Sequence, residues 1–255
     1  MKIQHIRNAT MIVESGDRKI LVDPMMSKKG VYPTFTLLRF RPRKNPVVDL
    51  PDNAKESFRG ITDCLVTHKH PDHIDKVAEA FLIENNIPVV CSELDEELFK
   101  KKGLLVSQTI KYWQKSEYLG GSITGIPARH GYGFIAKPMG NVTGFYIELP
   151  NEPSLYLSSD TIYTPEVKKA LDELKPDITV VASGTAQLDI GQPLLMRIDD
   201  IVKFIRNSPG KAIANHLEAV NHCPTSRQQL KEILSKEGLL NKTWIPDDGD
   251  ALEFD

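Results

Sequence analysis

The chain has 255 residues, of which 40% are hydrophobic and 26% charged, and its formal net charge at pH 7 is -2. That length can bury a full hydrophobic core, and the near-neutral charge disfavours nucleic-acid-binding proteins, which more often carry a clear basic excess. Cys64, Cys91 and Cys223 are an odd number without C-x-x-C spacing, which argues against a disulfide framework and a zinc ribbon.

The first part of the chain alternates as strands do and then becomes irregular. Its opening, MKIQHIRNAT, is too polar for a signal peptide, and no apolar run reaches the length of a membrane span, so we expect a cytoplasmic location. Strand patterns at 3–6, 10–14 and 19–23 end at Asp23-Pro24, because a residue before proline avoids helical geometry. Residues 25–58 have no periodicity, which predicts a lid or substrate-binding loop.

From residue 61 onward, strand and helix patterns alternate. Strands are predicted at 61–66, 87–91, 104–106, 121–130, 143–150, 154–160, 177–183, 211–216, 242–246 and 251–255. Helices are predicted at 73–86, 93–101, 199–208 and 224–238, with a further helix starting at 164. Without a repeat or a Pro/Ser-rich linker, this order predicts one domain over 1–255, in which two sheets pack face to face with helices outside.

The stretch THKHPDHID, residues 67–75, places three histidines and two aspartates directly after a predicted buried strand. His68 and His70 alternate, so in an extended segment they point to the same side. Asp72 has a structural alternative as the N-cap of the following helix. His73 in the first helical turn gains nothing from the helix dipole and fits better as a neutral ligand. The H-x-H-x-D-H pattern therefore predicts a metal site.

The remaining ligands must come from elsewhere, and three candidates stand at the C-terminal ends of predicted strands: His130, Asp160 and His216. Loops at one edge of a sheet converge, so these side chains can meet the first cluster. Asp160 has a structural alternative as a cap of the turn before the helix at 164. His222, six residues after His216, is either a loop histidine or a substrate contact.

The order T-H-x-H-x-D-H followed by distal His, Asp and His resembles the metallo-β-lactamase superfamily, as does the strand–turn–strand opening up to LVDP (21–24). The stretches NHLEAVNHCP and SSDTIYTPEV further resemble the branch that includes the ascorbate-6-phosphate lactonases. The opening HIRNAT departs from that branch, whose members commonly carry a glycine–histidine pair there. The resemblance covers nearly the whole chain and implies an α/β fold, the four-layer αβ/βα sandwich with two mixed sheets, and a metal-dependent hydrolase.

The resemblance also implies roles for the metal-capable side chains. His68, His70 and His130 would bind one ion, Asp72, His73 and His216 a second, and Asp160 would bridge the two. Asp23 would orient a ligand histidine. Histidine and carboxylate ligands suit two divalent ions, Zn²⁺, Mn²⁺ or Fe²⁺. A water bridging such a pair becomes hydroxide near neutral pH, so we expect Asp72 and Asp160 to be catalytic, with Asp72 relaying a proton to the leaving group.

The irregular segments predict the chemical class of the substrate. Residues 28–48 hold basic side chains and no acidic one, and Arg39, Arg41 and Arg43 would clamp an anion. A solvated basic loop is the structural alternative. Ser183, just before the loop 184–193, Thr185 within it, and His222 would add substrate contacts. We therefore expect hydrolysis of a small anionic ester or lactone, for example a sugar-phosphate lactone.

Two other functions are compatible with the same motif. A phosphodiesterase or nuclease would use the same ions, but it would need a longer basic track than this chain offers. A metal-binding sensor without catalysis would lack a ligand or have a blocked site, whereas all the expected ligands are present. The sequence leaves open whether the chain forms a homo-oligomer.

Overall fold

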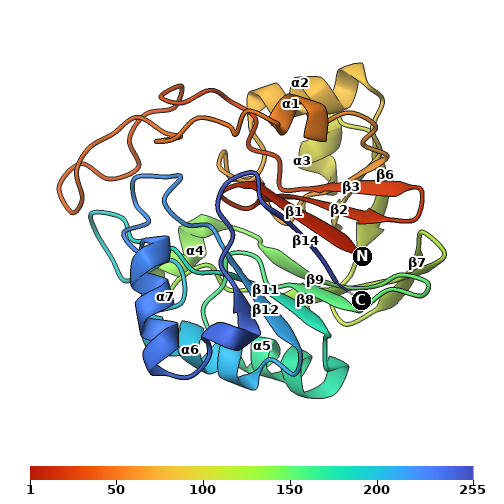
Figure 1. The fold of residues 1–255 in the computed structure, drawn as a ribbon. Helices are drawn as coiled ribbons and strands as arrows, with labels where there is room; N and C mark the ends of the chain where they lie inside the picture. Colours follow the sequence, from red (N-terminus) through yellow and green to blue (C-terminus); the bar gives the residue numbers. More distant parts are fainter. Residues whose placement is uncertain (255) are drawn as a thin grey trace.

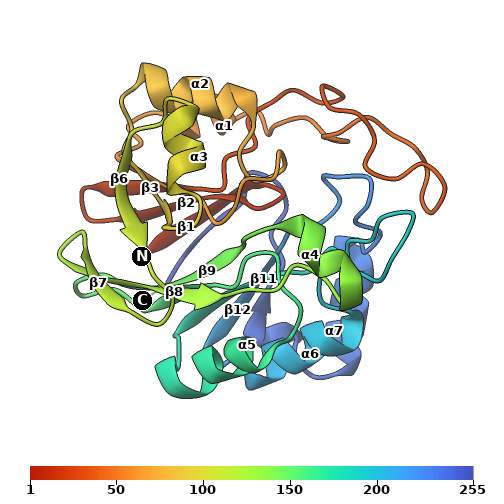
Figure 2. The same ribbon diagram turned by 180° about the vertical axis from the view of Figure 1, so that it is seen from behind.

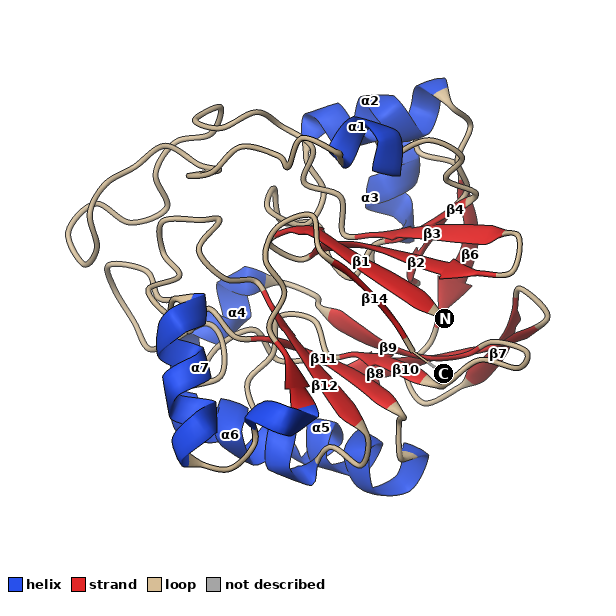
Figure 3. Ribbon diagram, in the orientation of Figure 1, coloured by secondary structure: helices blue, strands red, loops and turns tan. Residues whose placement is uncertain are grey.

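The computed structural model describes residues 1–254, which form two seven-stranded sheets packed face to face with helices on both outer faces (Figures 1 and 3). This arrangement confirms the predicted four-layer α/β sandwich. The two ends of the chain meet, since the amino group of Met1 donates to the carbonyl of Phe254 (2.8 Å). Across these residues, no helix has the length and apolarity required to cross a membrane.

The first sheet has the strand order β14-β1-β2-β3-β4-β5-β6. Its strands are β1 (Lys2–Arg7), β2 (Thr10–Ser15), β3 (Arg18–Val22), β4 (Asp63–Leu65), β5 (Val89–Ser92), β6 (Val106–Ile110) and β14 (Ala251–Glu253). β1 to β3 form an antiparallel meander, and β3 to β6 are parallel. Because parallel neighbours need crossover connections, α2 (Lys76–Glu84) and α3 (Glu96–Lys101) link β4 to β5 and β5 to β6.

The second sheet has the strand order β13-β12-β11-β10-β9-β8-β7. Its strands are β7 (Lys115–Tyr118), β8 (Gly121–Pro127), β9 (Thr143–Glu148), β10 (Leu155–Leu157), β11 (Ile178–Ala182), β12 (Lys211–Asn215) and β13 (Thr243–Trp244). Neighbours are antiparallel from β7 to β10 and parallel from β10 to β13. The crossovers contain α5 (Pro165–Lys169), which continues as a π-helical turn (Ala170–Leu174), α6 (Ile198–Asn207), and α7 (Arg227–Lys236) with a 3-10 turn (Leu240–Lys242).

The core between the sheets follows from strand alternation. Met11 and Val13 of β2 belong to the central cluster, where Phe145 and Ile147 of β9 face them from the second sheet. Ile12, between them in sequence, belongs instead to the cluster beneath α2 and α3. Successive side chains of a strand point to opposite faces, so each sheet has one apolar face toward the other sheet and one toward its helices.

Several predicted boundaries differ from the structure, and two of the differences have a clear cause. The helix predicted at 73–86 begins at Lys76, because Asp75 is its N-cap and accepts the N–H of Ala78 (2.8 Å). The cap considered for Asp72 is therefore wrong. The strand predicted at 104–106 is also wrong, since β6 covers 106–110. β6 is an edge strand with partly exposed polar side chains, so its own sequence lacks the apolar pattern of a buried strand.

Residues 25–58 lie between β3 and β4 and are irregular except for α1 (Ala54–Ser57) and a bridge between Tyr32 and Asn45. The fully buried side chain of Arg7 ties the start of the segment to its later part by donating to the carbonyls of Met25, Ser27 and Val48 (2.8–3.1 Å). Figures 1 and 2 show the segment extending beyond the edge at which the loops of the second sheet gather. A further helical piece, the 3-10 turn Gly133–Ile135 with α4 (Ala136–Met139), lies between β8 and β9.

Candidate metal centre

The loop of residues 67–75 leaves the first sheet just after β4. Asp23 anchors its start by accepting the backbone N–H of Thr67 (2.8 Å) and the Thr67 hydroxyl (2.7 Å). The loop then turns tightly, since the N–H of His73 donates to the carbonyl of His70 (2.9 Å). The turn brings the ring of His73 to 3.9 Å from that of His68, so residues five apart in sequence share one site.

Three later side chains reach this loop from the second sheet. β8, β10 and β12 run in the same direction and end at the same edge, and His130, Asp160 and His216 follow them. All three are at most 4% exposed. His216 has a left-handed backbone (φ 58°), and its N–H donates to the carbonyl of Asn8 (2.8 Å). The structure thus brings the three distant candidates and the loop together between the two sheets.

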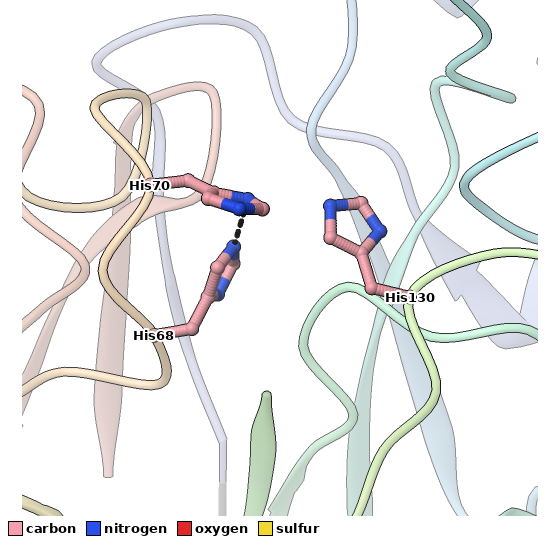
Figure 4. Close-up of side chains that lie close together, drawn as sticks. All are labelled: His68, His70 and His130. Carbon is pink, nitrogen blue, oxygen red and sulfur yellow. Dashed lines mark hydrogen bonds between the residues drawn. The ribbon is translucent and has the colours of Figure 1, made fainter. Parts of the chain in front are cut away.

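His68, His70 and His130 form the first group, with one nitrogen of each within 4.8 Å of the others. Figure 4 shows the His68 and His70 rings one above the other, with Nε2 of His68 3.1 Å from Nδ1 of His70, and His130 facing them. Nδ1 of His130 lies 3.1 Å from the carbonyl oxygen of Leu194. That contact occupies Nδ1 and leaves Nε2 for the site.

Asp72, His73 and His216 form a second group, with one ligand atom of each within 4.8 Å of the others. Asp160 lies between the groups. Its Oδ1 is 3.3 Å from Nε2 of His73, and its Oδ2 is 3.5 Å from Nε2 of both His130 and His216. Nε2 of His216 is also 3.3 Å from Oδ2 of Asp72. One carboxylate is therefore in reach of side chains from both groups, as the predicted bridging role requires.

Other residues hold the imidazoles in place. Oδ2 of Asp23 is 2.9 Å from Nδ1 of His73, which is the contact that its predicted supporting role requires. Sγ of Cys223 is 3.4 Å from Nδ1 of His216. A Cβ at Gly184 would lie 2.2 Å from the His216 carbonyl oxygen and 2.7 Å from Sγ of Cys223, so only glycine permits this approach.

Sequence reasoning missed two of these supports. Cys223 was considered only as one of an odd number of cysteines. Its position directly after His222, a candidate site residue, was a usable signal for a place near the site. Asn8, in the stretch where HIRNAT departs from the branch pattern, donates to the carbonyl of Asp72 (3.0 Å), and its Nδ2 is 3.4 Å from Nε2 of His216.

Burial and neighbouring charges divide the histidines into two sets. Burial, together with nearby imidazoles, lowers the pKa of His68, and it lowers the pKa of His70 to about 4. Burial also lowers the pKa of His130. These three rings are neutral at physiological pH and present lone pairs, which is the form that binds metal.

The second set carries charge in the protein alone. Burial opposes protonation of His73, yet Asp160 and Asp23 outweigh it and raise its pKa to about 10. Asp160 likewise raises the pKa of His216 despite burial. Burial would raise the pKa of Asp72 and of Asp160, but these imidazoles hold both well below the usual range. A divalent cation would replace the imidazole protons, because metal ligands bind in their deprotonated form.

The unpaired buried atoms fit such a cation. Nε2 of His73 and Oδ1 of Asp160 are both buried and lack a hydrogen-bond partner among residues 1–254, although they lie 3.3 Å apart. Buried polar atoms are nearly always hydrogen-bonded, so two that converge without a bond indicate a ligand between them. Imidazole nitrogens and carboxylate oxygens are the donors that Zn²⁺, Mn²⁺ and Fe²⁺ accept. The residues present therefore fit divalent metal ions.

A cavity of about 180 Å³ opens beside the two groups. Three metal-capable residues line it: His70, Asp72 and His130. The other lining residues are Phe35, Pro71, Met139, Leu188, Leu194 and His222. His222 is buried, its Nδ1 has no hydrogen-bond partner, and its ring meets Phe35 edge-on at 5.1 Å. Burial lowers its pKa to about 4, so the ring is neutral. Of the predicted substrate contacts, only His222 lines this cavity.

The other predicted substrate residues lie elsewhere. Arg39 donates from Nε to the Leu188 carbonyl (2.7 Å), and Arg41 and Arg43 line a different cavity, of about 440 Å³. Ser183 is buried and donates to the carbonyl of Val181 (3.0 Å). The hydroxyl of Thr185 is 2.5 Å from that of Thr225. All five therefore lie outside the lining of the cavity beside the metal-capable groups.

Residues 33–44 form what we call the strap, which runs over the cavity and carries Phe35. The carboxylate of Asp189 fastens it by accepting the backbone N–H groups of Leu37, Leu38 and Arg39 (2.8–2.9 Å) and the hydroxyl of Thr36. Asn221 fastens it from the other side by accepting the N–H of Phe35 (2.9 Å). The sequence offered no signal for either contact, because both loops lack periodicity.

Comparison with known proteins gives matches over most of the chain. A family model described as "Beta-lactamase superfamily domain" matches residues 18–216. The UPF0173 protein YddR of Bacillus subtilis (strain 168) is 34% identical over 257 residues, covering 100% of both chains.

Two solved structures are similar over almost the whole chain. A possible metal-dependent hydrolase from Veillonella parvula DSM 2008 is 28% identical, with a TM-score of 0.88 over 99% of this chain and 98% of that one. An isothiocyanate hydrolase from Delia radicum gut bacteria is 26% identical, with a TM-score of 0.89 over 100% of this chain and 99% of that one.

Proposed function

This chain belongs to the β-lactamase superfamily and is a metal-dependent hydrolase, and we propose that it works with two divalent metal ions. The observation that carries the proposal is the position of Asp160, whose carboxylate oxygens lie 3.3–3.5 Å from nitrogens of both histidine groups. A site for one ion would not need a carboxylate shared in this way.

Each ion would have its own set of side chains. His68, His70 and His130 would hold one, Asp72, His73 and His216 the other, and Asp160 both. A pair of such ions would supply Lewis acidity and would lower the pKa of a bound water toward about 7. Asp23, the Leu194 carbonyl and Cys223 keep the imidazoles in the orientation that this requires.

Two residues at the cavity would handle the substrate. Asp72 borders the cavity, so its carboxylate would take a proton from the attacking water and return it to the leaving group. His222 is neutral and unpaired at Nδ1, and it would donate or accept one hydrogen bond to orient the reacting group. Both roles need only atoms that already face the cavity or lack a partner.

For the scissile bond, we propose a small ester or lactone. A second candidate comes from the similar isothiocyanate hydrolase of Delia radicum gut bacteria, because hydrolysis of an isothiocyanate also begins with attack of water on an electrophilic carbon. A phosphodiester is the alternative with the same ions. The three classes differ in the charge and shape of the group attacked, so one substrate panel separates them.

The metal requirement is tested first by elemental analysis of the purified protein. We expect two transition-metal ions per chain, and a loss of at least one in His70→Ala, because the first group then loses a third of its nitrogens. His5→Asn is the matched control, since His5 is a buried histidine paired with Asp248 away from the site. Fewer than one tightly held ion per wild-type chain would contradict the proposal.

The reaction is tested with 4-nitrophenyl butyrate, γ-butyrolactone, allyl isothiocyanate and bis(4-nitrophenyl) phosphate. We expect turnover of at least one carbon-centred substrate, and a fall of about 10²-fold or more in kcat/KM for it in His70→Ala. Turnover that persists undiminished in His70→Ala would show that the hydrolysis does not use this site. Turnover of the phosphate diester alone would establish the phosphodiesterase instead.

A further inference from the structure

The cavity beside the metal-capable groups has an unusual lining for an enzyme of anionic substrates. Apart from His70, Asp72 and His130, its walls are five apolar residues and one histidine: Phe35, Pro71, Met139, Leu188, Leu194 and His222. These come from five separate segments of the chain, so the apolar character is a property of the assembled site. No single loop sequence reveals it.

Within residues 1–254, no lysine or arginine lines this cavity. The guanidinium of Arg39 points away to the carbonyls of Leu188 and Asp189, and Arg41 and Arg43 line the other cavity with Phe40 and Glu218. The basic loop therefore has no cation at the place where the non-reacting part of a substrate would lie. A charged group buried there would lose its hydration without gaining a partner.

The cavity is also small. At about 180 Å³ it is below the range of ligand pockets for drug-sized molecules, which is roughly 300–1,000 Å³. Phe35 on the strap and Leu188 on the facing loop both contribute to the lining, and Asp189 holds these two segments together. The small volume thus favours a small group beside the reacting bond, and the apolar walls favour an apolar one.

From this lining we infer that the site takes a small, uncharged substrate whose group next to the reacting bond is apolar. This inference rests on the proposed function and replaces the anionic substrate expected from the sequence. Leu188 and Met139 are then specificity-determining residues, because their side chains form the wall against which that apolar group packs. The two proposed ions would contact only the reacting group of the substrate.

Binding of two hydroxamates tests the inference without a known substrate, since hydroxamates chelate metal ions. The probes are butyrohydroxamate, which ends in a methyl group, and the monohydroxamate of succinate, which has the same chain length and ends in a carboxylate. Isothermal titration calorimetry on the metal-loaded protein should give a Kd at least about tenfold lower for butyrohydroxamate. Equal or tighter binding of the succinate compound, or binding of neither, overturns the inference.

Two variants place a cation in the wall. Leu188→Lys and Met139→Lys are each expected to reduce the preference for butyrohydroxamate by at least about tenfold, because the new ammonium pairs with the carboxylate of the other probe. Ile190→Lys is the matched control. It adds the same charge to the same loop, but Ile190 is 76% exposed and does not line the cavity, so the preference should stay unchanged.

The outcomes separate this inference from the proposed function. A wild-type protein that holds no metal ion contradicts the proposed function. A protein that holds two ions but prefers the carboxylate probe, or whose preference is unaffected by both lysine variants, contradicts the apolar wall alone. If one lysine variant fails to fold, the other still decides, because Leu188 and Met139 belong to different segments.

Discussion

At the scale of single residues, the site depends on what each imidazole contacts with its second nitrogen. Nδ1 of His73 faces the carboxylate of Asp23, whereas Nδ1 of His130 faces a backbone carbonyl. Nδ1 of His216 faces the sulfur of Cys223, whose pKa is raised by burial, so the group is a neutral thiol. Such contacts fix the ring orientation and the tautomer that leaves Nε2 free.

Cys223→Ala should therefore weaken metal binding while leaving every ligand in place. We expect a 10- to 100-fold loss of affinity for one of the two ions, roughly the loss seen when such supporting contacts are removed. Cys223→Ser keeps a hydrogen-bond acceptor and should lose less. Competition with a chromogenic chelator measures both affinities.

Cys91→Ala is the control for removing a buried thiol. Cys91 belongs to the core cluster beneath α2 and α3 and makes no contact with a metal-capable histidine. If Cys223→Ala and Cys91→Ala retain the same metal affinity, Cys223 does not position His216.

At the scale of elements, the strap is held by hydrogen bonds instead of an apolar face. The side chains of Leu37 and Leu38 are 61% and 90% exposed, so their burial does not attach the strap. Three backbone N–H groups and one hydroxyl donate to Asp189, and these bonds lower the pKa of its carboxyl. Because the folded pKa is depressed, this attachment is present above the unfolded value of about 3.9 and weakens as the pH falls below it.

Asp189→Asn should loosen the strap at neutral pH, because the amide replaces one charged acceptor oxygen by a donor. Trypsin then gains access to the bonds after Arg39 and Arg43, and we expect cleavage there to be roughly tenfold faster. Mass spectrometry of the early fragments locates the cuts.

Asp172→Asn removes an exposed carboxylate that pairs with Lys168, far from the strap, and should not change the cleavage rate. Unchanged cleavage in Asp189→Asn would mean that Asn221 and the rest of the loop hold the strap without Asp189.

At the scale of the whole molecule, the metal-capable residues come from both sheets. His68 to His73 follow a strand of the first sheet, and His130, Asp160 and His216 follow strands of the second. The sheets otherwise meet through the apolar cluster between them. Ions at this edge would therefore tie the two halves of the sandwich together.

Removing the ions should lower thermal stability. A ligand present at 100 times its Kd adds about 2.7 kcal/mol to the free energy of unfolding. For a chain of this size that corresponds to roughly 5–10 °C in Tm. Differential scanning calorimetry before and after chelation measures the change.

His70→Ala provides the comparison, since it should show a smaller difference between the two conditions. An identical Tm for metal-loaded and metal-free wild type would mean that the ions do not join the sheets.

The sequence by itself determined the class of the molecule and the candidate metal set. The pattern at 68–73 is local, so its spacing is visible without a fold. His130, Asp160 and His216 were identifiable because each follows a buried strand, and parallel strands of one sheet end at one edge. The family, the sandwich and the hydrolase class are confirmed, whereas the individual ligand and bridging roles stay predictions.

Only the tertiary structure decided what surrounds that set. Asp189 and the strap are about 150 residues apart in the chain, and the contact of Cys223 with His216 depends on Gly184 from a third segment. The arginines of the strap were expected at the substrate, but the strap turns them away and presents Phe35 instead. Regular elements have a period that sequence displays, while the path of an irregular loop is set by the distant partners that accept its hydrogen bonds.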